Sequence, residues 1–160
     1  MTPTEMTILS KADLLLDGDV AEAVMGRANI FGMSQAAEGA VLRPKDFGAF
    51  DHDLRAALAA RVARLAADDK LAAHYLSSAG DKAILAEPAE TGKAYQLDTV
   101  LAFVDKVANQ TRDIDAEDVA QLQASGMADA DIVRLCELVA FLAYQVRVIA
   151  GLRLMQGSAA

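Results

Sequence analysis

The chain has 160 residues, and its Asp and Glu outnumber its Lys and Arg by 23 to 15, for a formal net charge of -8. This excess of carboxylates argues against a nucleic-acid partner, because phosphate binding needs clustered cationic side chains. The single cysteine, Cys136, excludes a disulfide within the chain. The sequence shows no evident signal peptide or transmembrane run, so we expect a cytoplasmic protein that does not act on a membrane.

The composition predicts an all-α protein. Apolar residues make up 54% of the chain and are rich in Ala and Leu, both strong helix formers. A chain of this length buries a core of its own, so we expect one domain over residues 1–160 with about six to eight helices.

Residues 1–49 form a polar opening followed by helical periodicity. Apolar residues recur from Val20 to Phe31, with Asp19 placed to cap this helix and Gly32 placed to end it. A short helix over 34–40 and a loop over 41–49 are expected to follow.

Residues 50–87 are predicted to form two helices with a break between them. The first has an apolar stripe and an N-cap at Asp51; the stripe consists of Leu54, Leu58, Val62 and Leu65. The polar break at 66–70 precedes a second helix, for which Asp68 or Asp69 is the expected cap. Residues 88–96 show no periodicity and are predicted to be a linker between two halves of the domain.

The C-terminal part, residues 97–156, is predicted to hold three helices. The first covers about 97–110, and the second begins at Asp115, whose spacing from Asp118 is close to a capping box. The third begins near Asp129 and is apolar almost all round after residue 138. Such a helix belongs in the centre of a bundle or in a subunit interface.

Two stretches carry a resemblance to a known family. The sequence A-A-H-Y at 72–75, following the break, and the succession of helices over 97–152 together resemble the carboxymuconolactone decarboxylase and alkylhydroperoxidase family, also called AhpD-like or peroxidase-related. The resemblance covers about two thirds of the chain. It implies an AhpD-like helical bundle that forms homo-oligomers.

The resemblance also shows which functional residues differ. Redox members of the family carry C-x-x-C at the break, a His four residues after the second Cys and a Glu about three helical turns upstream. In this chain the Cys positions hold Ala67 and Lys70, the Glu position falls near Arg55, and only His74 matches. Thiol-based peroxide reduction needs a thiolate and a resolving thiol, so the sequence predicts no such activity at the break.

Three functional hypotheses follow, in this order. The first is a binding or assembly subunit, with a C-x-x-C-containing relative as a candidate partner. The second is a cysteine-independent enzyme, as the family's decarboxylases imply, in which His74 moves a proton and Arg55 or Lys70 binds the carboxylate of a small acid or lactone. The third is a peroxidase-related oxidoreductase that relies on Cys136 alone.

The remaining candidate residues are explained by structural roles. Cys136 lies among apolar residues and is expected to be a buried small hydrophobe. Asp68 and Asp69 are interpreted as caps, and neither a metal site nor a cofactor is predicted. Gln145 and Arg147 interrupt an apolar helix, so they need partners from residues 51–64 or from a neighbouring subunit.

Overall fold

A computed structural model describes residues 5–14 and 18–157, and every regular element in this part of the chain is helical. The prediction of an all-α protein is confirmed. The elements are α1 (Thr7–Ala12), α2 (Gly18–Met25), α3 (Ala28–Leu42), α4 (His52–Leu65), α5 (Asp69–Leu76), η2 (Gly80–Ala86), η3 (Lys93–Tyr95), α6 (Asp98–Asn109), η4 (Thr111–Asp113), α7 (Ala116–Ala124) and α8 (Asp129–Met155).

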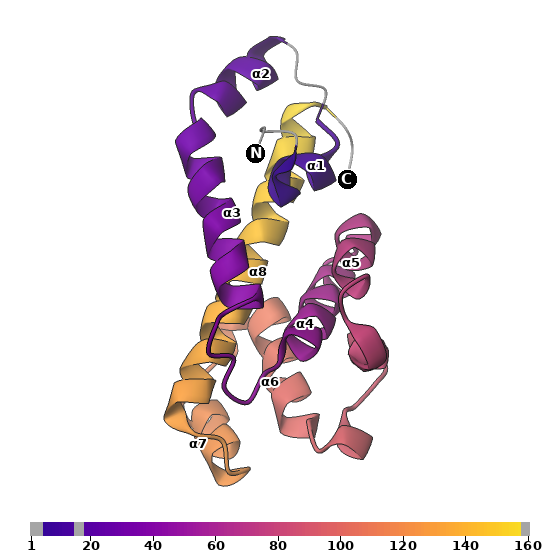
Figure 1. The fold of residues 1–160 in the computed structure, drawn as a ribbon, viewed down its shortest axis with the longest axis vertical. Coiled ribbons are helices and arrows are strands. Elements are labelled where there is room, and N and C mark those ends of the chain that lie inside the picture. Colours follow the sequence, from indigo (N-terminus) through magenta and orange to yellow (C-terminus); the bar gives the residue numbers. More distant parts are fainter. Residues whose placement is uncertain (1–4, 15–17, 158–160) are drawn as a thin grey trace.

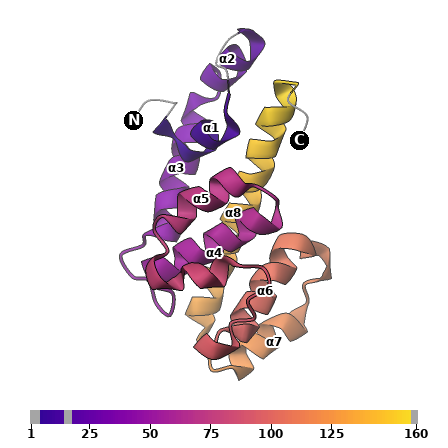
Figure 2. The ribbon, with the colours of Figure 1, turned by 90° about the vertical axis from the view of Figure 1, so that its right-hand side faces the viewer.

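The central helix is α4, in which every residue from 54 to 63 is buried. Many of these residues are alanines, and their small side chains allow α5, α6, η2 and α8 to pack closely against α4. The long α8 runs beside α3 along the molecule, while α6 and α7 pack at its N-terminal end (Figures 1 and 2). The C-terminal end of α8 contacts α1, and α1 also packs against α3. α3 in turn contacts α4, which carries α5 beside it.

The predicted caps of the central and C-terminal helices are confirmed. Asp51 accepts a 2.8 Å hydrogen bond from the backbone N–H of Leu54 at the start of α4. Of the two candidates for α5, Asp68 is the cap, and it accepts a 3.0 Å bond from the N–H of Leu71. Asp115 and Asp118 form a complete capping box on α7. The side chain of Asp19, predicted to cap the first helix, lies outside the described residues.

The predicted stop at Gly32 is wrong. The break occurs earlier, at residues 26–27, and α3 continues through Gly32 to Leu42. An internal glycine costs a helix about 1 kcal/mol relative to alanine. The tertiary structure offsets that cost, because one face of α3 is buried against α8 and α1; that face consists of Phe31, Ser34, Glu38 and Leu42. The correction matters for function, since it places Glu38 on the buried face of a long helix.

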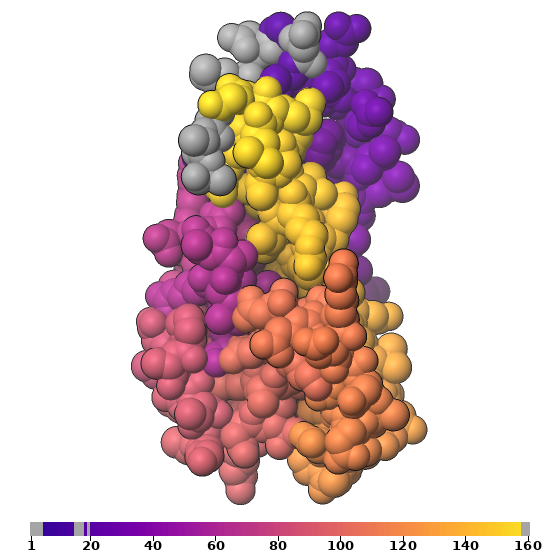
Figure 3. Space-filling view, turned by 180° about the vertical axis from the view of Figure 1, so that it is seen from behind, coloured from indigo at the N-terminus to yellow at the C-terminus, as the bar shows by residue number. Residues whose placement is uncertain are grey.

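The last helix, α8, is the element among the described residues whose length and apolar composition are sufficient to cross a membrane. The sequence predicts a chain with no transmembrane run, and the length and apolar composition of α8 differ from that prediction. Within the apolar window, 39% of the residues are buried in the protein. From behind, the C-terminal half of α8 is visible at the surface between the N-terminal helices and α4–α5 (Figure 3).

Candidate functional site

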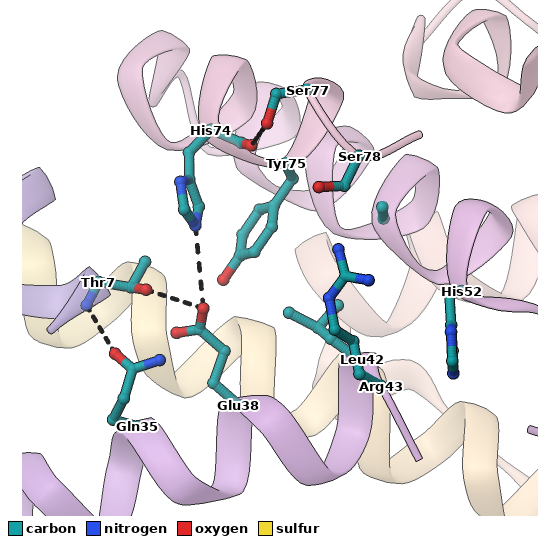
Figure 4. A pocket seen from close by; sticks show the side chains of 11 residues that line it. Thr7, Gln35, Glu38, Leu42, Arg43, His52, His74, Tyr75, Ser77 and Ser78 are labelled. Atoms are coloured by element: carbon teal, nitrogen blue, oxygen red, sulfur yellow. Dashed lines mark hydrogen bonds and ion pairs between the residues drawn. The ribbon is translucent and has the colours of Figure 1, made fainter. Parts of the chain in front are cut away.

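A pocket of about 270 Å³ lies where α3, α5 and the start of α4 meet, with α1 at one side (Figure 4). Both histidines of the chain, His52 and His74, line it. The complete lining consists of Thr7, Gln35, Glu38, Leu42, Arg43, His52, Ala56, His74, Tyr75, Ser77 and Ser78. Most of these side chains are polar, which suits a small hydrophilic ligand better than an apolar one.

The carboxylate of Glu38 is the deepest charged group of the pocket, with 6% of the residue exposed. Thr7 donates a 2.8 Å hydrogen bond to Oε1, and Gln145 donates a 2.8 Å bond to Oε2. These donors come from α1 and α8, so three helices fix the orientation of one carboxylate. Both donors are neutral, and they satisfy the hydrogen-bonding needs of the buried group without neutralising its charge.

The imidazole of His74 faces this carboxylate. Its Nε2 lies 3.9 Å from Oε1 of Glu38, and 36% of the side chain is exposed (Figure 4). An imidazole side chain can act as a general acid or a general base toward a molecule bound beside it. The pair can therefore take a proton from a bound molecule or return one to it.

Tyr75 and Gln145 extend the network behind Glu38. The hydroxyl of Tyr75 donates a 2.6 Å hydrogen bond to Oε1 of Gln145, and both residues are buried. Burial first, and then the charge of Glu38, raise the pKa of Tyr75 far above its ordinary value. Tyr75 consequently remains protonated and acts as a donor, which leaves His74 as the proton-exchanging group on this side of the pocket.

Arg43 and His52 lie on the other side of the pocket. Arg43 follows the last turn of α3 and is exposed. His52 Nε2 lies 3.0 Å from the carbonyl oxygen of Pro44. Because a carbonyl oxygen only accepts, this contact places a hydrogen on Nε2 and leaves Nδ1 of the neutral ring as an acceptor.

Of the three residues proposed from the sequence, the pocket includes His74 but not Arg55 or Lys70. Arg55 is buried, and its three guanidinium nitrogens donate to the carbonyls of Phe50, Val41 and Phe47 at 2.7, 2.8 and 3.0 Å. Burial, followed by the charge of Arg134, lowers the pKa of Arg55 from its ordinary value. These bonds make Arg55 a link between α4, the last turn of α3 and the loop that joins them.

Lys70 is exposed and forms an ion pair with Asp13. The ten residue steps from Arg55 to Leu65 correspond to a rise of about 15 Å along α4. Lys70 follows the turn after Leu65. The structure therefore does not bring Arg55 and Lys70 together as a cationic pair.

The break between α4 and α5 is filled by protein groups. Ala67 adopts the left-handed conformation, with a φ of 57°, and Asp68 is 5% exposed. Arg153 from α8 donates to the Asp68 carboxylate at 3.0 and 3.2 Å and to the carbonyl of Lys11 at 2.7 Å. The break is thus closed by the ion pair of Arg153 with Asp68 and by the hydrogen bond from Arg153 to Lys11.

Cys136 is exposed, so the prediction of a buried small hydrophobe is wrong. The apolar stripe of α8 places its neighbours Leu135 and Val139 in the core, and Cys136 lies at the exposed edge of this stripe. Partial burial of the thiol and the charge of Glu137 raise its pKa, which opposes formation of the reactive thiolate.

Sequence reasoning missed Glu38, and a usable signal existed. Glu38 is the one ionisable residue within α3, and its spacing from Phe31 and Ser34 places it on the buried face. A charged residue on an apolar helix face needs partners and deserves examination as a site residue. Gln145, whose partners were expected from residues 51–64 or another subunit, instead contacts α3 and α5.

The described residues contain no group of three or more His, Cys, Asp and Glu side chains arranged to hold a metal ion. No family model, no curated protein and no solved structure matches this chain.

Proposed function

We propose that this protein is a cysteine-independent enzyme that transfers a proton to or from a small carboxylic acid or lactone at His74. The observation that carries the proposal is the placement of His74 Nε2 opposite the buried carboxylate of Glu38 in a polar pocket. The resemblance of the chain to carboxymuconolactone decarboxylases supports a lactone acid as the substrate class.

The proposed step is a redox-neutral decarboxylation. The bond between the substrate's carbon skeleton and its carboxylate breaks, carbon dioxide leaves, and the electron pair passes into the conjugated lactone carbonyl. A proton from the His74 imidazolium then forms a new C–H bond, and water returns a proton to the neutral imidazole. Glu38 faces the imidazole, and Gln145, which accepts a hydrogen bond from Tyr75, orients Glu38.

The test measures carbon dioxide release from carboxymuconolactone by the purified protein. His74→Gln and Glu38→Gln each remove one member of the pair, and we expect turnover to fall roughly 100-fold or more for His74→Gln. Glu117→Gln, an exposed charge on α7, is the matched control and retains activity. Turnover that is unchanged in His74→Gln contradicts the proposal.

A binding or assembly subunit is the second candidate function. The filled break at Asp68 and the uncharged outer face of α3 support it. Exposed apolar residues occur there and on the outer side of α8; they include Ile30, Met33, Tyr144, Leu154 and Met155. Such a surface suits contact with another subunit.

Native mass spectrometry of protein recovered from its own host distinguishes the two candidates. A complex with a C-x-x-C-containing relative, disrupted by Met33→Glu and preserved in Glu117→Gln, supports the subunit function. A homo-oligomer that turns over the lactone acid supports the enzyme. An inactive monomer without a partner contradicts the subunit function.

A further inference from the structure

We infer that Arg43 forms a carboxylate-binding subsite in the same pocket, on the side opposite His74. This inference deepens the proposed function, because it names the group that holds the substrate's carboxylate. It rests on the pocket around Arg43 and His74, and its test measures binding separately from turnover.

Arg43 is a cation beside a pocket and has no acidic partner among the described residues. Its backbone N–H closes the last turn of α3 by bonding to the carbonyl of Gly39 at 2.9 Å, which fixes where the side chain begins. In Figure 4 the guanidinium points from the end of α3 toward Ser78 and α5. By contrast, Arg61 and Arg153 form short ion pairs with Asp105 and Asp68.

The carboxylate of Glu38 does not fill this role for Arg43, because its oxygens already accept from Thr7 and Gln145 and face His74. The pocket therefore combines a proton-exchanging pair at one side with an unpaired guanidinium at the other. A guanidinium binds a carboxylate through two parallel N–H donors.

The charge and the size of the pocket restrict the class of ligand that it can bind. Among the described residues that line the pocket, Arg43 is the one with a permanent positive charge, so the pocket offers one site for a carboxylate. A volume of about 270 Å³ is below the usual range of about 300–1,000 Å³ for drug-sized ligands. We therefore assign the subsite to the carboxylate of a small lactone acid that is retained in the reaction, while the reacting part of the molecule reaches His74.

The two histidines give a direct readout, since both line the pocket and the chain contains no other. Their imidazole proton signals in NMR spectra, assigned with His52→Gln and His74→Gln, are followed while γ-butyrolactone-γ-carboxylate is added. We expect concentration-dependent shifts in the wild type and affinity at least about 10-fold weaker in Arg43→Gln. The methyl ester of the probe and inorganic phosphate are expected to bind at least about 10-fold more weakly than the carboxylate.

Arg27→Gln is the matched control. It removes the same charge from the opposite end of α3, about 24 Å away along the helix axis, and is expected to bind the carboxylate like the wild type. Circular dichroism checks that each variant is folded. Equal binding by Arg43→Gln and the wild type, equal binding of the ester, preferential binding of phosphate, or no shift in the wild type overturns the assignment.

The same titration separates this inference from the proposed function. In His74→Gln, the signal of His52 still reports carboxylate binding, and that binding is expected to persist even though turnover is lost. If turnover survives in His74→Gln while Arg43→Gln loses binding, the proton-transfer function fails and the subsite stands. If turnover requires His74 but Arg43→Gln binds normally, the subsite fails and the function stands.

Discussion

Nε2 of Gln145 on α8 donates a 2.8 Å hydrogen bond to Oε2 of Glu38 on α3, although 107 residues separate the two in the sequence. Gln145 is fully buried, and its amide oxygen accepts from Tyr75 on α5. One amide thus joins the long C-terminal helix to both helices that carry the candidate acid–base pair. These two hydrogen bonds explain how the mostly apolar helix α8 accommodates a buried polar side chain near its middle.

Replacing Gln145 with leucine should destabilise the protein. The substitution leaves the Tyr75 hydroxyl and one oxygen of Glu38 buried without their partner, which costs on the order of 2–3 kcal/mol. Urea denaturation measures the effect. Gln121→Leu on the exposed face of α7 is the control and should change stability by less than about 0.5 kcal/mol. Equal stabilities for the two variants would show that the buried network contributes little.

Much of the helical architecture was predictable from local patterns. The caps at Asp51, Asp68 and Asp115 act within three residues, so the sequence reveals them directly. The continuation of α3 through Gly32 was not predictable in the same way, because Gly32 signals a stop locally and the burial of Phe31 against distant helices overrides it. Local signals therefore predicted the right class of fold but placed the break between the first helices at Gly32 instead of at residues 26–27.

The candidate site was only half predictable for the same reason. His74 was identified on its own helix, but its partner Glu38 comes from α3, across the wrongly placed boundary. Arg55 resembled a ligand-binding cation because no sequence pattern shows that the last turn of α3 and the loop before α4 direct three carbonyl groups toward it. Long-range contacts of this kind arise from tertiary packing, which helical periodicity does not encode.

Arg61 should be the most sensitive arginine in stability measurements. It is 2% exposed, donates to both oxygens of Asp105 at 2.6 and 2.7 Å, and also bonds to four carbonyls of residues 85–90. Arg61→Met removes the guanidinium donors of Asp105 and of these carbonyls, of which that of Glu87 still accepts from the backbone N–H of Glu90. The substitution should cost about 3 kcal/mol or more in a chemical denaturation experiment.

Arg112→Met, at an exposed position, is the control for this experiment and should be nearly neutral. Limited proteolysis adds a local readout, since Arg61 holds the segment at 87–90, and cleavage there should accelerate in Arg61→Met. A stable Arg61→Met variant with unchanged proteolysis would contradict the role assigned to this side chain.

The pair formed by Lys106 and Asp118 should make stability depend on pH. The hydrogen bond from Lys106 first, and then the backbone N–H of Asp115, lower the pKa of Asp118, while the same bond raises the pKa of Lys106. A lowered carboxyl pKa contributes stability above the unfolded value of about 4, and this contribution is lost as the pH falls through the folded value. A raised Lys pKa contributes below about 10.4 and is lost at higher pH.

Asp118→Asn should therefore lower the thermal midpoint at pH 7, and its difference from the wild type should shrink as the pH falls below about 4. Differential scanning calorimetry across this pH range measures the effect. The control is Glu22→Gln, an exposed charge on α2, whose profile should follow the wild type. A difference that stays constant with pH would mean that the Asn variant acts through the helix cap alone.

The thiol of Cys136 should react slowly at neutral pH, although it is exposed. Partial burial and the charge of Glu137 raise its pKa, so the thiolate fraction at pH 7 is smaller than that of an unstructured cysteine peptide. We expect iodoacetamide to alkylate Cys136 more slowly than such a peptide, with a rate profile displaced to higher pH. Glu137→Gln should increase the rate at pH 7, whereas Glu117→Gln should leave it unchanged.

The same experiment decides whether the peroxidase hypothesis deserves further work. A peroxidase acting through Cys136 alone needs a thiolate at neutral pH, together with an external thiol to complete the cycle. If Cys136 reacts faster than the peptide at pH 7, and Cys136→Ser abolishes peroxide consumption in the presence of such a thiol, the third hypothesis gains support over proton transfer at His74. Slow alkylation and unchanged peroxide consumption would instead leave the His74 pocket as the site of chemistry.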